Sequence, residues 1–187
     1  GKGEKNLIMV TLGTGVGGGV IVNGQPVVGA HGAGGEIGHI TVNNDEIEAC
    51  NCGQYGCLEQ YTSATGIVRL AKRKLAKSTE ETSIREIPNL TAKDVFDAAK
   101  AGDAIAIGLV DEVCEILGST LSNIACVVNP EIIVIGGGVS KAGDILLDNI
   151  KKHFVETSFM ACRDTKFALA GLGNDAGMYG CVEMLLD

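Results

Sequence analysis

The sequence predicts an α/β fold in which a central mixed sheet is flanked by helices. Three stretches of the 187-residue chain indicate this fold. Residues 5–28 combine apolar runs with glycines and an Asn-Gly pair, which is typical of a β-hairpin. Residues 104–155 contain a long apolar helical segment, a β-branched run and a second helical segment, which is typical of a strand buried on both faces. Between them, residues 39–57 form a loop with a histidine and three cysteines.

The first strand is predicted within residues 5–12, whose apolar run Leu7–Val10 leads into the glycine-rich stretch 13–19. These glycines satisfy the pattern G-x-G-x-x-G, but a dinucleotide site also needs a helix next and an acidic residue about twenty positions later. No helix signal follows, and the glycine stretch does not end in the Lys-Ser/Thr pair of a Walker loop. Val20–Val22 and Asn23–Gly24 come next, so we expect the glycines to join two strands of a hairpin.

The glycine turn of this hairpin is a candidate phosphate site. Small residues let backbone N–H groups approach phosphate oxygens closely, and the hydroxyl of Thr14 adds a further donor. A glycine hairpin with a purely structural role is the alternative.

The cysteine-rich loop has the composition of a metal site. Cys50, Cys52 and Cys57 follow the spacing Cys-x-Cys-x4-Cys, and His39 upstream can be a fourth ligand. Zinc takes nitrogen and sulfur ligands at tetrahedral angles, and a shell closed by four protein ligands makes the ion structural rather than catalytic. Three free cysteines that happen to cluster are the alternative.

Two glutamates flank these candidate ligands. Glu36 precedes His39 by three residues and shares a face with it in a helix or tight turn, and Glu59 follows Cys57 by two. Carboxylates held by a metal-stiffened loop are suited to accept hydrogen bonds from the hydroxyls of a polyol or sugar. The alternative is that both glutamates are solvated surface residues.

Three helices are predicted after the loop. Residues 64–77 are amphipathic, with a basic face that we expect to be solvated, and the polar residues 77–89 form a surface excursion. Thr91 and Asp94 make a capping box for a helix that reaches residue 100. A third helix follows from 104 to about 127, with enough apolar positions for burial beneath a sheet. These helices are interpreted as scaffold.

The carboxyl-terminal part of the sequence predicts a strand, a glycine turn and a helix. Residues 131–135 are β-branched, Gly136, Gly137 and Gly138 follow, and a helix is expected over 144–155. A nucleotide can lie against the exposed backbone of such a turn, and a tight connection that needs small residues is the alternative. A short strand at 166–169 and a terminal helix at 178–186, capped by Asp175, complete the predicted elements.

The motifs in residues 36–39 (Glu-Ile-Gly-His) and 50–59 (Cys-x-Cys-Gly-x-x-Gly-Cys-Leu-Glu) resemble the signature of the ROK family of bacterial sugar kinases and sugar-responsive repressors. Residues 34–41 and 60–69 look most like those of its glucokinases. The resemblance spans nearly the whole chain. It implies an actin-like ATPase lobe with a ribonuclease H-like sheet, a structural zinc ion, and ATP with Mg²⁺ as the phosphoryl donor.

The resemblance also implies residue roles. Zinc would be held by His39, Cys50, Cys52 and Cys57, and the sugar would be contacted by Glu36, His39 and Glu59. The stretch from Thr11 to Gly19 resembles the second phosphate loop, and the later glycines resemble the adenosine motif. The implied nucleotide-binding residues are Thr11, Gly13, Thr14, Gly15, Gly17, Gly136, Gly137 and Gly138.

Kinases of this superfamily carry their catalytic base, an Asp preceded by Asn, and a first phosphate loop, Asp-x-Gly-Gly-Thr, on an N-terminal lobe. No Asp-x-Gly-Gly-Thr loop occurs here, and Asn174-Asp175, which lies at the wrong end of the sequence, is not assigned as the catalyst. We therefore expect residues 1–187 to form the single carboxyl-terminal lobe of a two-lobed glucokinase, with no catalytic residue of its own and no activity alone. The terminal helix 178–186 is expected to belong with the absent lobe.

Composition limits the partners that we expect. The chain has 23 acidic and 15 basic residues, and no Lys/Arg stripe is interleaved with aromatics, which argues against nucleic-acid binding. No apolar run is long enough for a membrane span, and residues 1–5 do not resemble a signal peptide, so we expect a cytoplasmic protein. The expected partners are glucose or a related hexose, ATP, the absent lobe and, by resemblance, further copies of the chain.

Two alternatives to a glucokinase stay open at this point. A ROK-family transcriptional repressor senses sugar through the same kind of site, although such proteins often have a degraded phosphate loop and the glycines here are intact. A ROK kinase for fructose, N-acetylmannosamine or N-acetylglucosamine is the second, because the residues named above contact hydroxyls that these hexoses share.

Overall fold

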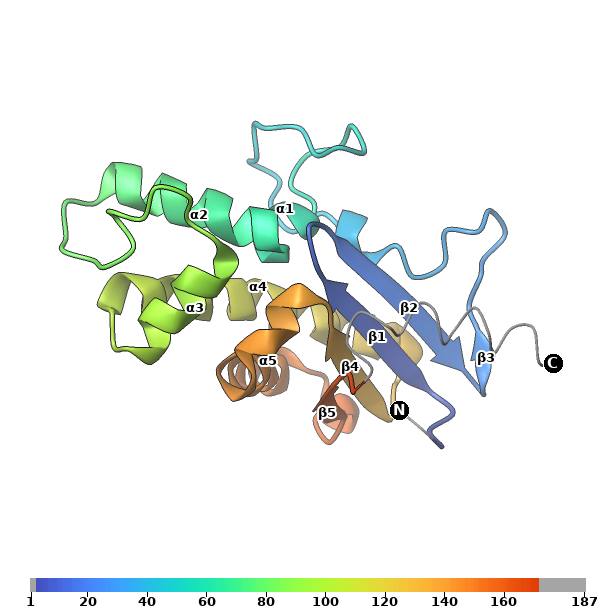
Figure 1. The fold of residues 1–187 in the computed structure, drawn as a ribbon. Coiled ribbons are helices and arrows are strands. Elements are labelled where there is room, and N and C mark those ends of the chain that lie inside the picture. Colours follow the sequence, from blue (N-terminus) through green and yellow to red (C-terminus); the bar gives the residue numbers. More distant parts are fainter. Residues whose placement is uncertain (1–2, 172–187) are drawn as a thin grey trace.

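A computed structural model describes residues 3–171, and it confirms the predicted α/β fold (Figure 1). The sheet has five strands in the order β3-β2-β1-β4-β5. Their bounds are β1 Leu7–Leu12, β2 Val16–Val22, β3 Gln25–Pro26, β4 Ile132–Gly136 and β5 Lys166–Leu169. The first three strands pair antiparallel, whereas β4 lies parallel to both β1 and β5. The sheet is therefore mixed, as predicted.

The hairpin of β1 and β2 forms for local reasons. Asn23 and Gly24 have φ angles of 53° and 77°, the left-handed conformation that a two-residue hairpin turn between β2 and β3 requires. In β1 the side chains of Ile8, Val10 and Leu12 are fully buried, and the residues between them are partly or fully exposed. This alternation places one face of the hairpin in the core.

The helices are α1 Glu59–Thr62, α2 Ala64–Lys77, α3 Ala92–Lys100, α4 Ala104–Val128 and α5 Asp144–Thr157, with 3₁₀ turns η1 Ile37–His39, η2 Gly138–Ala142 and η3 Met160–Cys162. The capping box of Thr91 and Asp94 forms as predicted at the start of α3. Helices α4 and α5 share one apolar core with the buried faces of β1 and β4. They approach closely because position 118 on α4 is glycine: a Cβ there would lie 2.7 Å from the carbonyl oxygen of Ile150.

Two expectations about local structure are wrong. The apolar alternation of residues 40–42 predicts a short strand, but no strand forms there, because the chain pairs only through a single bridge between Thr41 and Cys57. The basic face of α2 is not simply solvated, since Arg69 and Arg73 reach the carboxylate of Glu46 on the cysteine-rich loop. Sequence periodicity identified the charged face of the helix but could not show what lies against it.

The remaining expectations for the elements hold where they can be compared. The helix predicted at 64–77 and the strand at 166–169 have these bounds in the structure. The terminal helix at 178–186, with Asn174 and Asp175, lies outside the described residues. Within residues 3–171 no helix combines the length and the apolar character needed to cross a membrane.

Candidate functional site

The cysteine-rich loop brings the four predicted metal ligands together. The ligand atoms of His39, Cys50, Cys52 and Cys57 all lie within 4.8 Å of one another. The sulfurs of Cys52 and Cys57 are 3.7 Å apart, and the sulfur of Cys50 is 3.9 Å from Nδ1 of His39. Four donors around one point form a candidate metal centre.

The donor set fits zinc. With Zn–S bonds of about 2.3 Å and tetrahedral angles, ligand sulfurs are expected roughly 3.8 Å apart, close to the separation of Cys52 and Cys57. Three sulfurs and one imidazole nitrogen are also a common composition of structural zinc sites. Burial raises the pKa of the Cys57 thiol, and a bound cation would oppose this shift by favouring the thiolate.

The local fold of the loop follows from its backbone. Gly56 has a φ of +71°, and a Cβ there would lie 1.8 Å from the carbonyl oxygen of Asn43, so only glycine fits. The carbonyl of Gly56 accepts from Val42, and the amide of Cys50 donates to Gln54. These hydrogen bonds fold the segment back on itself, and in Figure 1 it projects as the loop above α1.

His39 can serve the metal and a neighbouring site at once. Its Nδ1 faces the sulfur of Cys50, while its Nε2 lies 4.0 Å from a carboxylate oxygen of Glu36, one turn of η1 away. Glu36 is largely exposed, with 62% of its side chain accessible. A carboxylate and the outer edge of the imidazole therefore face solvent together beside the candidate metal centre.

Glu59 joins the metal centre to the glycine hairpin. One of its carboxylate oxygens accepts from the backbone N–H of Val16 at 3.0 Å, and the other lies 3.7 Å from the sulfur of Cys50. A Cβ on Gly15 would lie 2.1 Å from the first oxygen. The hairpin can approach the carboxylate this closely only because position 15 is glycine.

A shallow hollow of about 430 Å³ collects residues from both glycine-rich stretches. It is lined by Thr11, Gly13, Gly15, Val16, Gly17, Glu59, Gly137 and Gly138. The two stretches meet because β1 and β4 are parallel neighbours, so their carboxyl ends lie at the same edge of the sheet. Backbone N–H groups at such an edge suit an anion.

Two of the predicted nucleotide-binding residues do not line this hollow. The carbonyl of Thr14 accepts a hydrogen bond from the hydroxyl of Thr65 at 2.7 Å. Gly136 is buried at the end of β4, where a Cβ would lie 2.7 Å from the terminal methyl of Met9. The hydrogen bond at Thr14 and the close packing at Gly136 explain these two residues without a bound ligand.

A second, more enclosed hollow of about 260 Å³ adjoins the first and shares Gly138 with it. Its lining combines the apolar side chains of Phe96 and Val139 with the cations Lys100 and Lys141. Sequence analysis missed these residues, because α3 was interpreted as scaffold. A lone aromatic residue on a helix and a lysine shortly after a glycine run were the available signals, and neither is specific.

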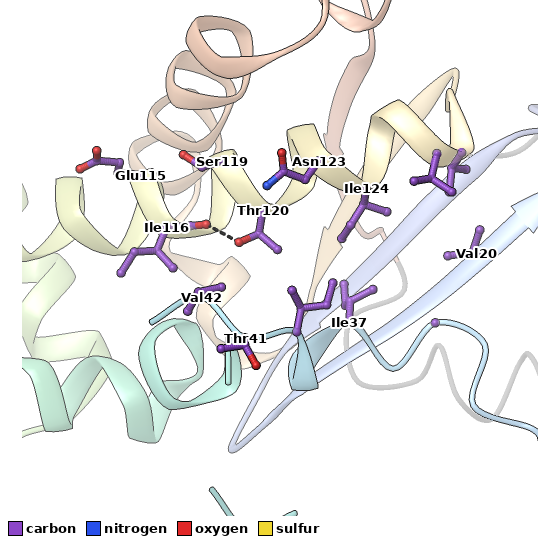
Figure 2. A pocket seen from close by; sticks show the side chains of 14 residues that line it. Val20, Ile37, Thr41, Val42, Glu115, Ile116, Ser119, Thr120, Asn123 and Ile124 are labelled. Atoms are coloured by element: carbon purple, nitrogen blue, oxygen red, sulfur yellow. Dashed lines mark hydrogen bonds between the residues drawn. The ribbon is translucent and has the colours of Figure 1, made fainter. Parts of the chain in front are cut away.

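A larger apolar hollow, of about 700 Å³, lies elsewhere, between α4 and the base of the cysteine-rich loop. Figure 2 shows Ile37, Val42, Ile116 and Ile124 around it, with the Thr120 hydroxyl hydrogen-bonded to the Ile116 carbonyl. Among the described residues that line it, Glu115 is the only ionisable one. It has neither the metal ligands nor the glycine turns, so we do not assign it as the functional site.

Comparison with known proteins gives a consistent result. A model of the ROK family matches residues 1–187. A glucokinase of Halalkalibacterium halodurans is 50% identical over 184 residues, which are 96% of this chain and 56% of that protein. The crystal structure of a ROK family glucokinase from Streptomyces griseus, in complex with glucose and AMPPNP, aligns with a TM-score of 0.87 at 32% identity. That alignment covers 97% of this chain and 61% of the other.

A repressor is also among the relatives. The xylose repressor of Caldicellulosiruptor bescii is 29% identical over 184 residues, which are 97% of this chain and 46% of that protein. This chain thus spans little more than half of the two glucokinases and less than half of the repressor. The match of the family model over the whole sequence, together with the histidine–cysteine cluster and the mixed sheet, shows that the chain belongs to the ROK family.

Proposed function

We propose that this chain is the carboxyl-terminal lobe of a two-lobed kinase that phosphorylates glucose to glucose 6-phosphate with ATP and Mg²⁺. The observation that carries the proposal is the position of Glu59, whose carboxylate contacts both the candidate metal centre and the glycine hairpin. A sugar bound at this carboxylate would lie next to the hollow formed by the two glycine-rich stretches. That arrangement suits transfer of a phosphoryl group to a sugar hydroxyl.

The proposed sugar site consists of Glu36, His39 and Glu59. Carboxylates accept hydrogen bonds from sugar hydroxyls, and the outer nitrogen of His39 can donate or accept according to its tautomer. A zinc ion with four protein ligands supplies a structural cross-link of the loop and no open coordination position. The residues of the loop therefore bind and orient the sugar. Similarity to a glucokinase that is 50% identical supports glucose as the hexose.

The proposed nucleotide site consists of the two adjoining hollows. The shallow hollow, with backbone N–H groups of the glycine turns, would take the phosphates. The more apolar hollow beside it would bind the nucleoside. Phe96 and Val139 would contact the base, and Lys100 or Lys141 would lie beside the polar groups of the nucleotide. Because Gly138 lines both hollows, one extended nucleotide could occupy the two together.

Phosphoryl transfer needs a carboxylate to accept the proton of the attacking hydroxyl, which contributes roughly 10²–10⁴ to the rate. In our proposal this base and the first phosphate loop lie on the other lobe of the kinase. The chain's coverage of 56% and 61% of two glucokinases is consistent with such a division. The 187-residue chain alone would then bind zinc without phosphorylating glucose.

The test is a coupled assay of glucose 6-phosphate formation on the complete gene product and on the 187-residue chain. We expect ATP-dependent product from the first and none above background from the second. Product from the isolated chain would contradict the division between lobes. A sugar-responsive repressor is the second candidate, supported by similarity to the xylose repressor. A calorimetric titration that detects no ATP binding to the complete protein would favour it.

A substitution at Gly15 tests the role of Glu59. In Gly15→Ala the new methyl group would displace the Glu59 carboxylate, because it would lie 2.1 Å from one carboxylate oxygen. Hydrogen bonds to charged groups contribute about 1.5–3 kcal/mol, so glucose affinity should fall about tenfold or more in calorimetry without nucleotide. Gly13→Ala is the control, since its nearest neighbour is a backbone oxygen 4.0 Å away. Equal glucose affinity of both variants and wild type would exclude Glu59 as a sugar ligand.

A further inference from the structure

The cysteine-rich loop is attached to the protein at a second place, away from the metal ligands. Glu46, four residues before Cys50, has a side chain that is only 1% exposed. A buried carboxylate is unfavourable unless it is paired and hydrogen-bonded. Its partners belong to α1 and α2, so Glu46 links the loop to the helices that follow it. We refer to Glu46, Tyr61, Arg69 and Arg73 as the Glu46 clamp.

The hydrogen bonds of the clamp saturate the Glu46 carboxylate. Oε2 accepts from the Tyr61 hydroxyl at 2.6 Å, from Arg69 at 2.6 Å and from Arg73 at 2.9 Å. Oε1 accepts from a second nitrogen of Arg73 at 2.9 Å. Oε1 also accepts hydrogen bonds from the backbone N–H groups of Ile47 and Glu48, each at 3.0 Å. The carboxylate thus holds the backbone of the loop at residues 47 and 48 against the arginine side chains of α2.

The charges in the clamp agree with this role. The hydrogen bond from Arg73 and those from Tyr61, Glu48 and Arg69 lower the pKa of Glu46 far below its ordinary value, although burial opposes them. Arg69 and Arg73 also reach Glu48, whose side chain is 57% exposed. Arg69 lies 5.2 Å from the ring centroid of Tyr61. The two guanidinium groups are therefore neutralised by carboxylates from one short stretch of the loop.

The loop beyond the clamp is tied to α1 by Gln60. Its side-chain nitrogen donates to the carbonyl of Glu48 at 2.9 Å, and its side-chain oxygen accepts from the N–H of Cys57 at 3.1 Å. No atom of these contacts is a metal ligand. The backbone that leads into Cys50 and the backbone at Cys57 are thus positioned by contacts that do not depend on a bound ion.

We infer that Glu46 is a positioning residue for the metal centre, which holds the loop in its metal-binding conformation before the ion binds. Residues 46–48 stay fixed to α1 and α2 when the ion is absent, and only the tip from 50 to 56 is ordered by the metal. A ligand set that is held in place binds metal more tightly, because less of the chain must be ordered on binding. The inference rests on the proposed zinc site and is independent of the proposed sugar and nucleotide sites.

The first test compares zinc affinities by competition with a chromogenic chelator. Glu46→Gln keeps the shape of the side chain but leaves two arginines without their buried counter-charge. We expect zinc to bind about 10–100-fold more weakly, the range found when outer-shell partners of metal ligands are changed. Glu48→Gln is the matched control, since it removes the same charge two residues away from an exposed position, and should bind zinc like wild type.

The second test needs no variant. Zinc is removed with a chelator, and hydrogen exchange of single amides is compared with that of the zinc-bound protein. The amides of Ile47 and Glu48, which donate to Glu46, should stay protected, whereas those of Cys50 and Gly53 should exchange faster. Loss of protection at all four amides together would overturn the inference, as would equal zinc affinity of Glu46→Gln and wild type. Absence of zinc binding by wild type would instead refute the metal site.

A conservative variant covers the case in which Glu46→Gln does not fold. Tyr61→Phe removes a single hydrogen bond to Glu46 and keeps the aromatic ring in the core. It should fold and bind zinc more weakly than wild type, with faster exchange at Ile47 and Glu48. Zinc affinity and exchange like those of wild type would count against the clamp.

Discussion

Replacing Cys52 with serine should abolish stoichiometric zinc binding while the protein stays folded. Cys52 is exposed, so a serine there leaves no buried cavity, but it removes one of the sulfurs of the cluster. Changing an outer-shell partner of a metal ligand weakens binding about 10–100-fold, and loss of a direct ligand should exceed that. Elemental analysis after dialysis should find about one zinc per wild-type chain and well under one per Cys52→Ser chain.

Cys126→Ser is the matched control for this experiment. Cys126 is also an exposed thiol, but it lies on α4 and is not one of the clustered ligands. It should keep its zinc. If Cys52→Ser retained as much zinc as Cys126→Ser, the candidate metal centre would be refuted. If Cys52→Ser lost its zinc but bound glucose like wild type, the metal centre would be supported, and a role of the zinc in shaping the sugar site would be excluded.

Replacing Gly137 with alanine should destabilise the fold strongly. Gly137 has φ 84° and ψ −179°, a region of backbone space that is essentially restricted to glycine. A Cβ at this position would also lie 2.5–2.6 Å from backbone atoms of Leu12, at the end of the central strand β1. Such backbone strain is worth about 1–3 kcal/mol, and overpacking adds about 1–3 kcal/mol.

Together these effects should lower the free energy of unfolding by about 2–6 kcal/mol, and the midpoint of thermal unfolding by at least about 4 °C for a chain of this size. Differential scanning calorimetry measures both. Gly138→Ala is the control, because Gly138 has no positive φ and a Cβ there would meet nothing within 4 Å. Equal stability of the two variants would show that Gly137 does not hold β1 and β4 in the close approach that forms the proposed phosphate hollow.

Most of the secondary structure could be predicted because its signals are local. Asn23-Gly24 specifies a turn through the backbone preferences of two residues, and the box of Thr91 and Asp94 specifies a helix start through two hydrogen bonds. The cysteine spacing is also a local signal, since three thiols within one short loop are close in space because they are close in sequence. The one false strand, at residues 40–42, arose because apolar alternation indicates an extended chain but not a partner to pair with.

The functional arrangement could be predicted only in part. Resemblance to the ROK family implied a sugar-binding role for Glu59 and a nucleotide-binding role for both glycine stretches. It did not indicate that Glu59 accepts a hydrogen bond from Val16 or that Phe96 and Lys141 lie beside Gly138. Glu46 had no sequence signal at all. A single glutamate in a polar loop is ordinarily solvated, and it becomes buried here only because two arginines on α2 lie opposite it.

The sequence by itself thus determined most of the described helices and strands, the clustering of the candidate metal ligands and the family. The tertiary structure decided which residues from distant parts of the chain face one another: Glu59 and the hairpin, the two glycine turns, and Glu46 with its arginines. The physical reason is that turns, caps and clustered thiols are fixed by neighbours in sequence. Ion pairs and hollows depend on the pairing of β1 with β4 and on the packing of α2 against the loop, which no short stretch of sequence encodes.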